Sequence, residues 1–557
     1  MLAVGTLASL YQNHLEQFPE RSILIQDGHA LSYSAFDNQV SLTRSWLSAQ
    51  GVKSGDRIAV WVVNRSEWLV LFFALAQLNA TLVAVNTKYR SHELQYILSN
   101  SQVSILVLQL NFRKIDFAQV IQGVDGKALP FLEKIIMLDA QSDAPMQLLD
   151  KPVIAFDIPL VKTSPNTKIT SNPVHANANP DALAAFFTTS GTTRGPKLVM
   201  HTQRTLTEHA NDVAQGYNFA GSDNRLLCAL PFCGVFGLNS ALAAIAAGMP
   251  LVLMDFFDAA SASSLIQSER VTHVFGSDEM LRRLIEHVDQ QAIERSEPCD
   301  IPFPALSLFG FASFSPRFIE LARALTARGF PLRGLYGSSE VHALFSIQRP
   351  DLPLEDRALG GGMPAANPRA RVRVKDPDTG QLCSPYTPGE IEIFSPTLFK
   401  GYFNNDEATS SAFTTDGYFK TGDLGYMRDD ASFVYLSRMG DTMRLGGFLV
   451  DPTEIEHVLA EQPEVDSAQV VGIEINGQLR PVAFATPKRD QPAPDAEKIR
   501  ARLATTLAAF KVPVHLWFID AFPATQSANG LKFQRVKLRD MALTRLRSDD
   551  GNTRDLS

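Results

Sequence analysis

Phe186–Lys197, which reads FFTTSGTTRGPK, passes from two aromatic residues into threonine, serine, glycine, proline and lysine. The apolar residues that lead into it, ALAAFF, are typical of a buried strand. The residues that follow lack the bulk to pack a core, but they offer hydroxyls, backbone N–H groups and a cation. Small residues let the backbone approach a ligand, and successive N–H groups can point together at an anion. The stretch therefore predicts a strand that ends in a phosphate-binding loop, and a solvated turn is the alternative for the loop taken alone.

The spacing of this loop excludes a P-loop of the Walker type. That motif needs a glycine, four residues and then Gly-Lys-Ser/Thr. Here three residues separate Gly191 from Gly195, and Pro196 stands before Lys197. The loop must therefore bind phosphate in another way.

The composition is that of a globular enzyme. The chain has 557 residues, of which 45% are hydrophobic and 20% charged, so it can form several domains. A formal net charge of -8 disfavours a nucleic-acid partner, so a polyphosphate ligand would need local cations and backbone dipoles. The four cysteines show no paired CxxC spacing, which favours a reducing compartment without structural zinc.

The N-terminal and apolar segments predict a cytoplasmic protein. The first twenty residues have no basic segment before their short apolar stretch, so we expect no secretory signal. The longest apolar passage, Trp68–Asn86, is interrupted by Gln77, Asn79 and Thr81. It reads as a core helix followed by a strand, and we expect no integral membrane segment.

Strand and helix patterns alternate along the first part of the chain, as in Gly55–Val63, Ser66–Ala80 and Thr81–Asn86. Such alternation predicts an α/β fold of parallel-type βαβ sheets, with ligand clefts at the carboxyl ends of the strands. From about Ala365 the pattern changes to short strands and turns, which indicates a small β-rich subdomain. After Arg438 it changes to a small α+β domain. We expect a large N-terminal domain over residues 1–438 and a C-terminal domain over residues 439–557.

The opening loop resembles the phosphate loop of the acyl-adenylate-forming (AMP-binding) enzymes, which include acyl-CoA synthetases, adenylation domains and luciferases. Their pattern is roughly (S/T)SG(S/T)TGxPK. The residues in register are Thr189, Ser190, Gly191, Thr192, Thr193, Pro196 and Lys197. Arg194 replaces the second glycine of the pattern, which removes backbone freedom and adds a cation. The resemblance implies that the loop binds the phosphates of ATP, with Thr192 and Lys197 acting in catalysis.

A second stretch, LYGSSEVHALF from Leu335, resembles the YGxTE motif of this family. The resemblance implies that Tyr336 stacks on adenine, that Ser339 lies near the α-phosphate and that Glu340 binds Mg2+. An aromatic face suits a purine, and a hard cation prefers carboxylate oxygen. Two further nucleotide-binding residues of the stretch are Gly337 and Ser338.

Three later stretches continue the resemblance. In GYFKTGD and the segment after it, Asp423 would accept both ribose hydroxyls and Arg438 would contact ribose or phosphate. In MRLGGFLVDPTEIE, Gly447 matches the glycine that lines the pantetheine channel, and Arg444 stands where lysine is common. Gly440, shortly before this stretch, falls at the hinge. The C-terminal domain would therefore be mobile.

The C-terminal stretch FPATQSANGLKFQRVKLRDMA is similar to the family's signature that ends in Gly-Lys. Leu531 intervenes between Gly530 and Lys532 in this chain. We assign the catalytic lysine to Lys532, with Lys537 as the alternative.

Two departures affect the expected acyl pocket. In LPFCGVFGLNS, Gly234 stands where many members have histidine; in LFGFASFS, Phe311 replaces the second glycine of a common Gly-Gly-Ala. We expect a reshaped pocket, and aromatic and medium-chain fatty acids both remain open. The resemblance places nucleotide contacts at Gly310, Phe311 and Ala312. It places the acyl pocket at Gly234, Val235, Phe236, Phe311, Val341 and His342.

Together the motifs predict an ATP- and Mg2+-dependent ligase that joins a carboxylic acid to coenzyme A. The acid would attack ATP to give acyl-AMP and pyrophosphate, and the CoA thiol would then displace AMP. Glu340, through Mg2+, and Lys532 would neutralise charge in the first step. The partners would be small molecules, with the protein a monomer or homodimer. The alternatives are an adenylating enzyme that loads an acyl carrier protein and a nucleotide-binding pseudoenzyme with a regulatory role.

Overall fold

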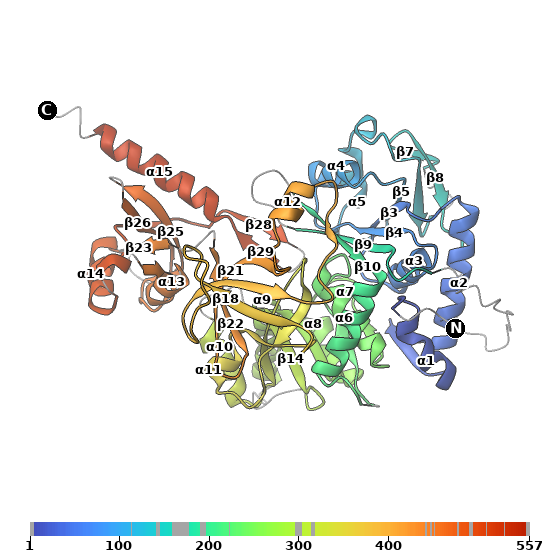
Figure 1. Cartoon of the computed structure of the whole chain (residues 1–557), viewed down its shortest axis with the longest axis horizontal. Helices are drawn as coiled ribbons and strands as arrows, with labels where there is room; N and C mark the ends of the chain where they lie inside the picture. The colour runs from blue at the N-terminus through green and yellow to red at the C-terminus, as the bar shows by residue number, and fades with distance from the viewer. Residues whose placement is uncertain are drawn as a thin grey trace.

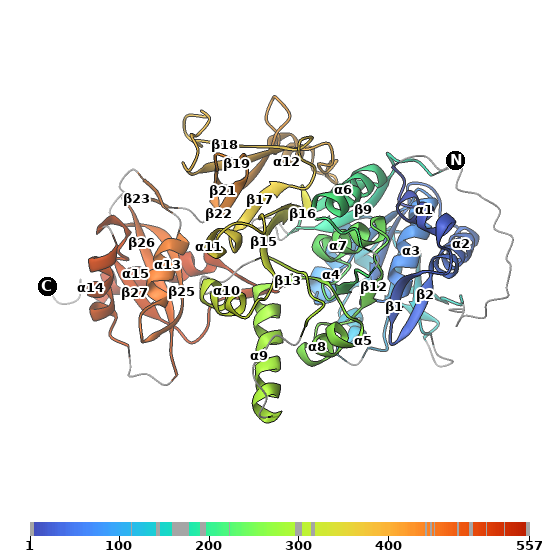
Figure 2. The ribbon, with the colours of Figure 1, turned by 90° about the horizontal axis from the view of Figure 1, so that it is seen from below.

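The computed structural model describes residues 5–112, 114–140, 145–158, 178–189, 196–221, 223–295, 303–312, 318–439, 443–445, 448–450, 452–475, 478–489, 494–507, 509–527 and 530–552. A large N-terminal domain and a small C-terminal domain lie next to one another, as Figures 1 and 2 show. Both mix helices and strands, which confirms the expected α/β class.

One sheet of the large domain contains nine described strands. In spatial order they are β20 (Gly401–Tyr402), β10 (Leu198–Thr202), β9 (Leu183–Thr188), β4 (Thr81–Ala84), β3 (Arg57–Trp61), β5 (Ile105–Gln109), β6 (Lys134–Leu138), β8 (Lys151–Ala155) and β7 (Gln147–Leu148). The strands from β9 to β8 pair in parallel, whereas β10 and β20 are antiparallel additions. The predicted phosphate loop joins β9 to β10, where the pairing changes direction.

A second sheet contains thirteen described strands. In spatial order they are β18 (Arg371–Lys375), β19 (Gly389–Phe394), β21 (Phe419–Met427), β22 (Phe433–Arg438), β17 (Gly360–Pro364), β16 (His342–Ile347), β15 (Leu332–Ser338), β14 (Leu308–Ala312), β13 (His273–Ser277), β11 (Leu226–Cys228), β12 (Leu251–Leu253), β1 (Ser22–Gln26) and β2 (His29–Ser32). The strands from β1 to β15 pair in parallel, and those from β15 to β18 are antiparallel. The expected β-rich segment after Ala365 therefore extends this sheet.

The described helices of the large domain cover both sheets. They are α1 (Ser9–Gln17), α2 (Tyr33–Ala49), α3 (Ser66–Gln77), α4 (Ser91–Asn100), α5 (Phe117–Gln122), α6 (Gln203–Gly216), α7 (Val235–Ala246), α8 (Ala259–Ser268), α9 (Asp278–Arg295), α10 (Phe318–Ala327), α11 (Leu354–Arg357) and α12 (Asp406–Ser411). Helix α6 contacts β9 and β10 of the first sheet and β16 of the second. It therefore joins the two places where strand direction changes.

The apolar segments of the sequence are buried in the core of the large domain. Every residue of α3 is buried, as expected of a helix that is apolar on all sides. Phe186 and Phe187 on β9 pack into different core clusters, because successive side chains of a strand point to opposite faces. The strand before the loop is thus fixed from both sides.

The small domain is built on three strands, β25 (Val465–Ile475), β26 (Gln478–Pro487) and β27 (His515–Phe518). Its helices are α13 (Pro452–Ala460), α14 (Ala496–Thr506) and α15 (Arg535–Asn552), and its hairpins are β23 (Met443–Leu445) with β24 (Phe448–Val450) and β28 (Ala524–Ser527) with β29 (Gly530–Phe533). In Figure 1 the β28–β29 hairpin reaches from this sheet toward the large domain.

The sequence predicts no integral membrane segment, and the lengths and polarity of the helices bear on that prediction. None of the described helices combines the length and apolar character that crossing a bilayer requires.

Candidate active site

The stem of the predicted phosphate loop is held by two hydrogen bonds between Thr189 and Lys197. The Thr189 N–H donates to the Lys197 carbonyl at 3.0 Å, and the Lys197 N–H donates to the Thr189 hydroxyl at 3.3 Å. These contacts continue the β9–β10 ladder, in which Thr188 pairs with Leu198. The loop residues Ser190, Gly191, Thr192, Thr193 and Arg194 lie outside the described residues.

A tyrosine connects the end of this loop to the predicted magnesium ligand. The Lys197 ammonium lies 4.5 Å from the centroid of the Tyr402 ring, within the range of a cation–π interaction. The Tyr402 hydroxyl donates to Oε1 of Glu340 at 2.9 Å. Burial and the Glu340 charge raise the pKa of Tyr402 far above its usual value, so the phenol keeps its proton. Lys197, Tyr402 and Glu340 therefore form one connected group.

Glu340 lies in the turn between β15 and β16 and is 9% exposed. Its Oε2 accepts the Ser338 hydroxyl at 2.9 Å, while Oε1 accepts Tyr402. Each oxygen can accept more than one hydrogen bond, so the carboxylate keeps free lone pairs. Mg2+ prefers oxygen ligands and is often held by one carboxylate together with substrate phosphates. The free lone pairs of the Glu340 carboxylate oxygens are therefore suitable ligands for Mg2+.

A second buried carboxylate, Asp423, belongs to β21 and is bound by two predicted site residues. The Tyr336 hydroxyl donates to its Oδ2 at 2.6 Å, and Arg438 Nη1 donates to its Oδ1 at 2.8 Å. Burial raises the pKa of Asp423, and the charge of Arg438 opposes that rise. Asp423 and Arg438 are cross-strand partners, so the antiparallel register of β21 and β22 brings them together.

The Tyr336 ring is largely enclosed. It is 7% exposed and packs edge-on against Phe433, with ring centroids 5.2 Å apart. Gly337 and Ser338 follow it on β15, and the Ser339 carbonyl accepts a hydrogen bond from His201 at 2.7 Å. The second predicted motif therefore forms one continuous edge beside Glu340.

The predicted acyl-pocket residues separate onto two faces of β14. A Cβ added at Gly310 would lie 2.5 Å from the Phe275 ring, and Phe275 packs against Phe236 at 6.2 Å between centroids. Phe311 points the other way and is buried with Phe309 in the core next to α8, α9 and α10. Strand alternation therefore places the Phe311 ring on the face opposite Gly310, and its effect on the acyl pocket stays a prediction.

The other predicted pocket residues lie at the starts of α7 and β16 or directly before them. Gly234 is the N-cap residue of α7, and Val235 and Phe236 begin the helix. Ala312 ends β14. Val341 is buried with Tyr336 and Tyr402 in the core cluster beside the antiparallel strands. The His342 ring is fully buried between two other imidazoles, so we do not assign it to the acyl pocket.

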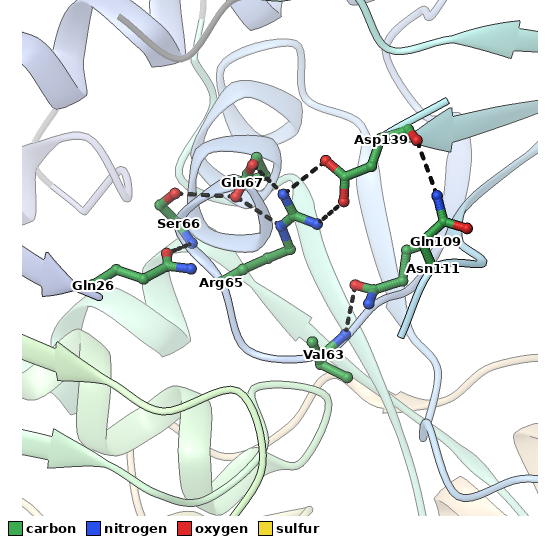
Figure 3. A network of polar contacts seen from close by, with 8 residues as sticks. All are labelled: Gln26, Val63, Arg65, Ser66, Glu67, Gln109, Asn111 and Asp139. Atoms are coloured by element: carbon green, nitrogen blue, oxygen red, sulfur yellow. Dashed lines mark hydrogen bonds and ion pairs between the residues drawn. The ribbon is translucent and has the colours of Figure 1, made fainter. Parts of the chain in front are cut away.

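The loop that leads to Gly234 is anchored to the first sheet. Asn64 donates to the Leu230 carbonyl at 2.8 Å and accepts the Phe232 N–H at 2.7 Å. The next residue, Arg65, forms ion pairs with Glu67 and Asp139, as Figure 3 shows. This network fixes the end of β3 and, through Asn64, the entry to α7.

The predicted C-terminal site residues are only partly described. Lys532 lies on β29 and pairs with Thr525 of β28. Lys537 is exposed on α15. Arg444 lies on β23, and Gly440 and Gly447 lie outside the described residues.

The sequence analysis missed three residues of the site region. They are Tyr402 and the histidines at positions 201 and 209, which contact residues next to or within the Glu340 turn. The only signal for Tyr402 was an aromatic residue after Gly401 in the stretch KGYF. The two histidines belong to no local motif. Their contacts could not be predicted, because their partners are more than a hundred positions away along the chain.

Comparison with known families covers most of the chain. A family model described as AMP-binding enzyme matches residues 11–403. A second model, described as AMP-binding enzyme C-terminal domain, matches residues 454–529.

Similar proteins and structures span nearly the whole chain. A medium-chain fatty-acid–CoA ligase of Escherichia coli is 28% identical, with 98% of this chain and 92% of that protein covered. A 2-succinylbenzoate–CoA ligase of Bacillus licheniformis is 29% identical, with coverages of 94% and 97%. A solved structure of O-succinylbenzoate coenzyme A synthetase from Bacillus subtilis, in complex with ATP and magnesium ion, has a TM-score of 0.74 at 25% identity, with coverages of 95% and 98%.

Proposed function

Because this chain belongs to the AMP-binding enzyme family and is an AMP-forming acid–CoA ligase, we propose that it activates a medium-chain fatty or aromatic acid. The observation that carries this proposal is the connected group of Lys197, Tyr402 and Glu340. It joins the end of the phosphate loop to a buried carboxylate that can bind Mg2+. ATP and Mg2+ are the cofactors of the reaction, and CoA is the proposed acyl acceptor.

In the first step, a carboxylate oxygen of the acid attacks the α-phosphorus of ATP and pyrophosphate leaves. The protein has little covalent chemistry to do, so it aligns the reactants and neutralises the developing charge. Lys197 and the loop residues Thr189, Ser190, Gly191, Thr192 and Thr193 are the proposed phosphate ligands. Glu340 is the proposed ligand of Mg2+, which would offset the negative charge of the phosphates.

The nucleoside would bind beside Asp423. A buried carboxylate that already accepts Tyr336 and Arg438 still has lone pairs for ribose hydroxyls. Arg438 would stay next to that carboxylate and contact ribose or phosphate. The backbone of Gly310, Ala312, Gly337, Ser338 and Ser339 would line the rest of the nucleotide site.

The small domain would supply the remaining groups. We propose a boundary between residues 438 and 439, with Lys532 acting in the first step and the Gly447 loop in the second. The β28–β29 hairpin, which carries Lys532, reaches toward the large domain in Figure 1, and this supports the role of Lys532. In the second step the CoA thiol attacks the acyl carbonyl, the carbonyl–phosphate bond breaks, and AMP leaves.

The acid would lie near Gly234, Val235 and Phe236. Support comes from relatives that act on a medium-chain fatty acid and on 2-succinylbenzoate, which are both bulky and partly apolar. Phe236 and Phe275 pack against one another beside Gly310, where a side chain would not fit, so the start of α7 is lined by aromatic residues. A glycine at position 234 leaves room at the start of α7.

A pyrophosphate-exchange screen tests this proposal. Fatty acids of graded length, benzoates and arylacetates are each mixed with the protein, ATP, Mg2+ and labelled pyrophosphate. We expect exchange with members of one acid class, and thioester and AMP formation on addition of CoA. No exchange with any acid would instead favour a pseudoenzyme, and thioester formation only with a holo acyl carrier protein would favour the carrier-loading alternative.

A further inference from the structure

Three imidazoles stack directly behind the Glu340 turn. His201 on β10, His342 on β16 and His209 on α6 lie in that order, with His342 in the middle. The ring centroids are 4.0 Å apart between His201 and His342, and 4.5 Å apart between His209 and His342. All three residues are buried. Buried polar rings need hydrogen-bond partners, and the two outer rings find theirs in the backbone around Glu340.

The outer histidines hold the backbone on both sides of Glu340. His201 Nε2 is 2.7 Å from the Ser339 carbonyl, and His209 Nε2 is 2.7 Å from the Ala343 carbonyl. A carbonyl only accepts hydrogen bonds, so both Nε2 atoms carry the proton. The carboxylate of Glu340 therefore projects from a segment that is fixed one residue before it and three residues after it.

This segment needs such support, because its backbone is strained. His342 and Leu344 have φ angles of 68° and 64°, in the left-handed region that residues other than glycine rarely adopt. Such conformations persist only where the surroundings determine them strongly. The Tyr217 hydroxyl adds a third contact by donating to the Leu344 carbonyl at 2.9 Å.

Strand β10 also follows directly after Lys197, the proposed phosphate ligand at the end of the loop. His201 lies on this strand, four positions after Lys197. The same strand thus touches the Glu340 region twice, through Lys197 with Tyr402 and through His201 with Ser339. Strand β10 therefore connects Lys197, at the end of the predicted phosphate loop, to the turn that carries Glu340.

We propose that His201 and His209 are positioning residues that fix the Glu340 carboxylate against the phosphate loop, with His342 as the ring that separates them. This inference rests on the proposed function of Glu340 as the magnesium ligand. Because a magnesium site requires accurate oxygen geometry, displacement of the turn weakens metal use before it unfolds the protein.

Two substitutions at one position separate the role of the ring from that of the hydrogen bond. His201→Phe keeps a flat ring in the stack but leaves the Ser339 carbonyl without its donor. His201→Gln removes the ring and restores an amide donor. His273→Phe is the matched control, because His273 is a buried imidazole on β13 that packs against Phe219.

Hydrogen exchange of residues 336–345 in the ligand-free protein is the first measurement. We expect faster exchange in His201→Phe, partial recovery in His201→Gln and no change in His273→Phe. The second measurement is the Mg2+ concentration that half-saturates pyrophosphate exchange, which should rise about tenfold in His201→Phe, as expected for one lost buried hydrogen bond. Thioester formation from supplied acyl-adenylate should stay near the wild-type rate.

The outcomes distinguish this inference from the proposed function. Wild-type protein without pyrophosphate exchange would overturn the proposed function, while hydrogen exchange would still decide the positioning role. A His201→Phe protein with a lower Tm but wild-type exchange in residues 336–345 and wild-type Mg2+ dependence would overturn the inference. If that variant does not fold, His209→Phe gives the same test from the other side, because it leaves the Ala343 carbonyl without its donor. Faster exchange is again expected, and wild-type values would again contradict the role.

Discussion

The Glu340 turn and the Asp423 strand each present a buried carboxylate to the proposed site, but the two carboxylates have different partners. Asp423 has a cation in direct contact, because Arg438 binds its Oδ1. Among the described residues, Glu340 makes no ion pair, and its two oxygens accept only hydroxyl groups. In this part of the chain, cations act on Glu340 from further away, Lys197 through the Tyr402 ring and Arg438 through its charge.

This difference indicates different roles. A buried carboxylate without a cation is costly unless an ion or ligand completes it, so Glu340 suits a metal. A carboxylate that is already neutralised attracts a metal weakly but still accepts hydrogen bonds, so Asp423 suits neutral hydroxyls. The pattern of partners therefore supports the proposed metal ligand at Glu340 and the proposed ribose ligand at Asp423.

The strongest test of this contrast is Glu340→Gln, which keeps the shape of the side chain and removes its charge. We expect pyrophosphate exchange to fall about 100- to 1,000-fold, because stabilisation of charge in the transition state is lost. The Mg2+ dependence should weaken, and thermal unfolding should show a folded protein. Activity within a few-fold of wild type would show that Glu340 does not bind the metal.

Asp423→Asn should act on the nucleotide instead of the metal. The amide loses one charge-assisted acceptor, so we expect KM for ATP to rise roughly tenfold to thirtyfold, with a smaller change in kcat. The Mg2+ concentration for half-saturation should stay near the wild-type value. Asp416→Asn is a matched control, because Asp416 also pairs with an arginine, Arg373, and is 55% exposed. A change in Mg2+ dependence in Asp423→Asn would erase the contrast.

The sequence predicts both carboxylates because each belongs to a short contiguous motif. Tyr336 to Glu340 forms one strand end and turn, and Asp423 lies on a strand whose hairpin partner ends at Arg438. In both cases the residues that matter are fixed by local backbone geometry. The same reasoning predicted the strand before the phosphate loop and the α/β class.

Contacts between distant segments could not be predicted. Tyr402 reaches Glu340 across 62 positions, and His201 reaches Ser339 across 138. Nothing in one sequence specifies that β20 lies beside β10, which is what brings Tyr402 to the site. Alternation on β14 was predictable, but the face of the strand that borders Phe236 was not, because it depends on packing against distant segments of the chain.

Tyr402→Phe tests whether the hydroxyl link tunes Glu340. The variant keeps a ring under Lys197 and removes one hydrogen bond to Oε1, so we expect about a fivefold loss of pyrophosphate exchange. Tyr418→Phe is the matched control, since Tyr418 also carries a cation on its ring, Arg373 at 3.7 Å. Equal losses in the two variants would assign the effect to general destabilisation.

The smallest effect concerns pH and the cost of the charge on Asp423. Burial raises the folded-state pKa of this group above its ordinary value of 3.8, despite the opposing charge of Arg438. The stabilisation from its protonated form is therefore complete below the unfolded-state pKa and is lost as pH rises through the folded-state pKa. The free energy of unfolding of Asp423→Asn should gain on that of wild type as pH rises through this window.

Chemical denaturation of both proteins from acid to neutral pH measures this difference. The asparagine variant does not titrate at position 423, so subtraction removes the contributions of the groups that both proteins share. If the wild type gains on the variant instead, Arg438 lowers the pKa of Asp423 more than burial raises it. The charge of Asp423 would then be stabilised by Arg438 in the folded protein, whereas Glu340 has no ion pair among the described residues. The contrast that supports a metal at Glu340 would become larger.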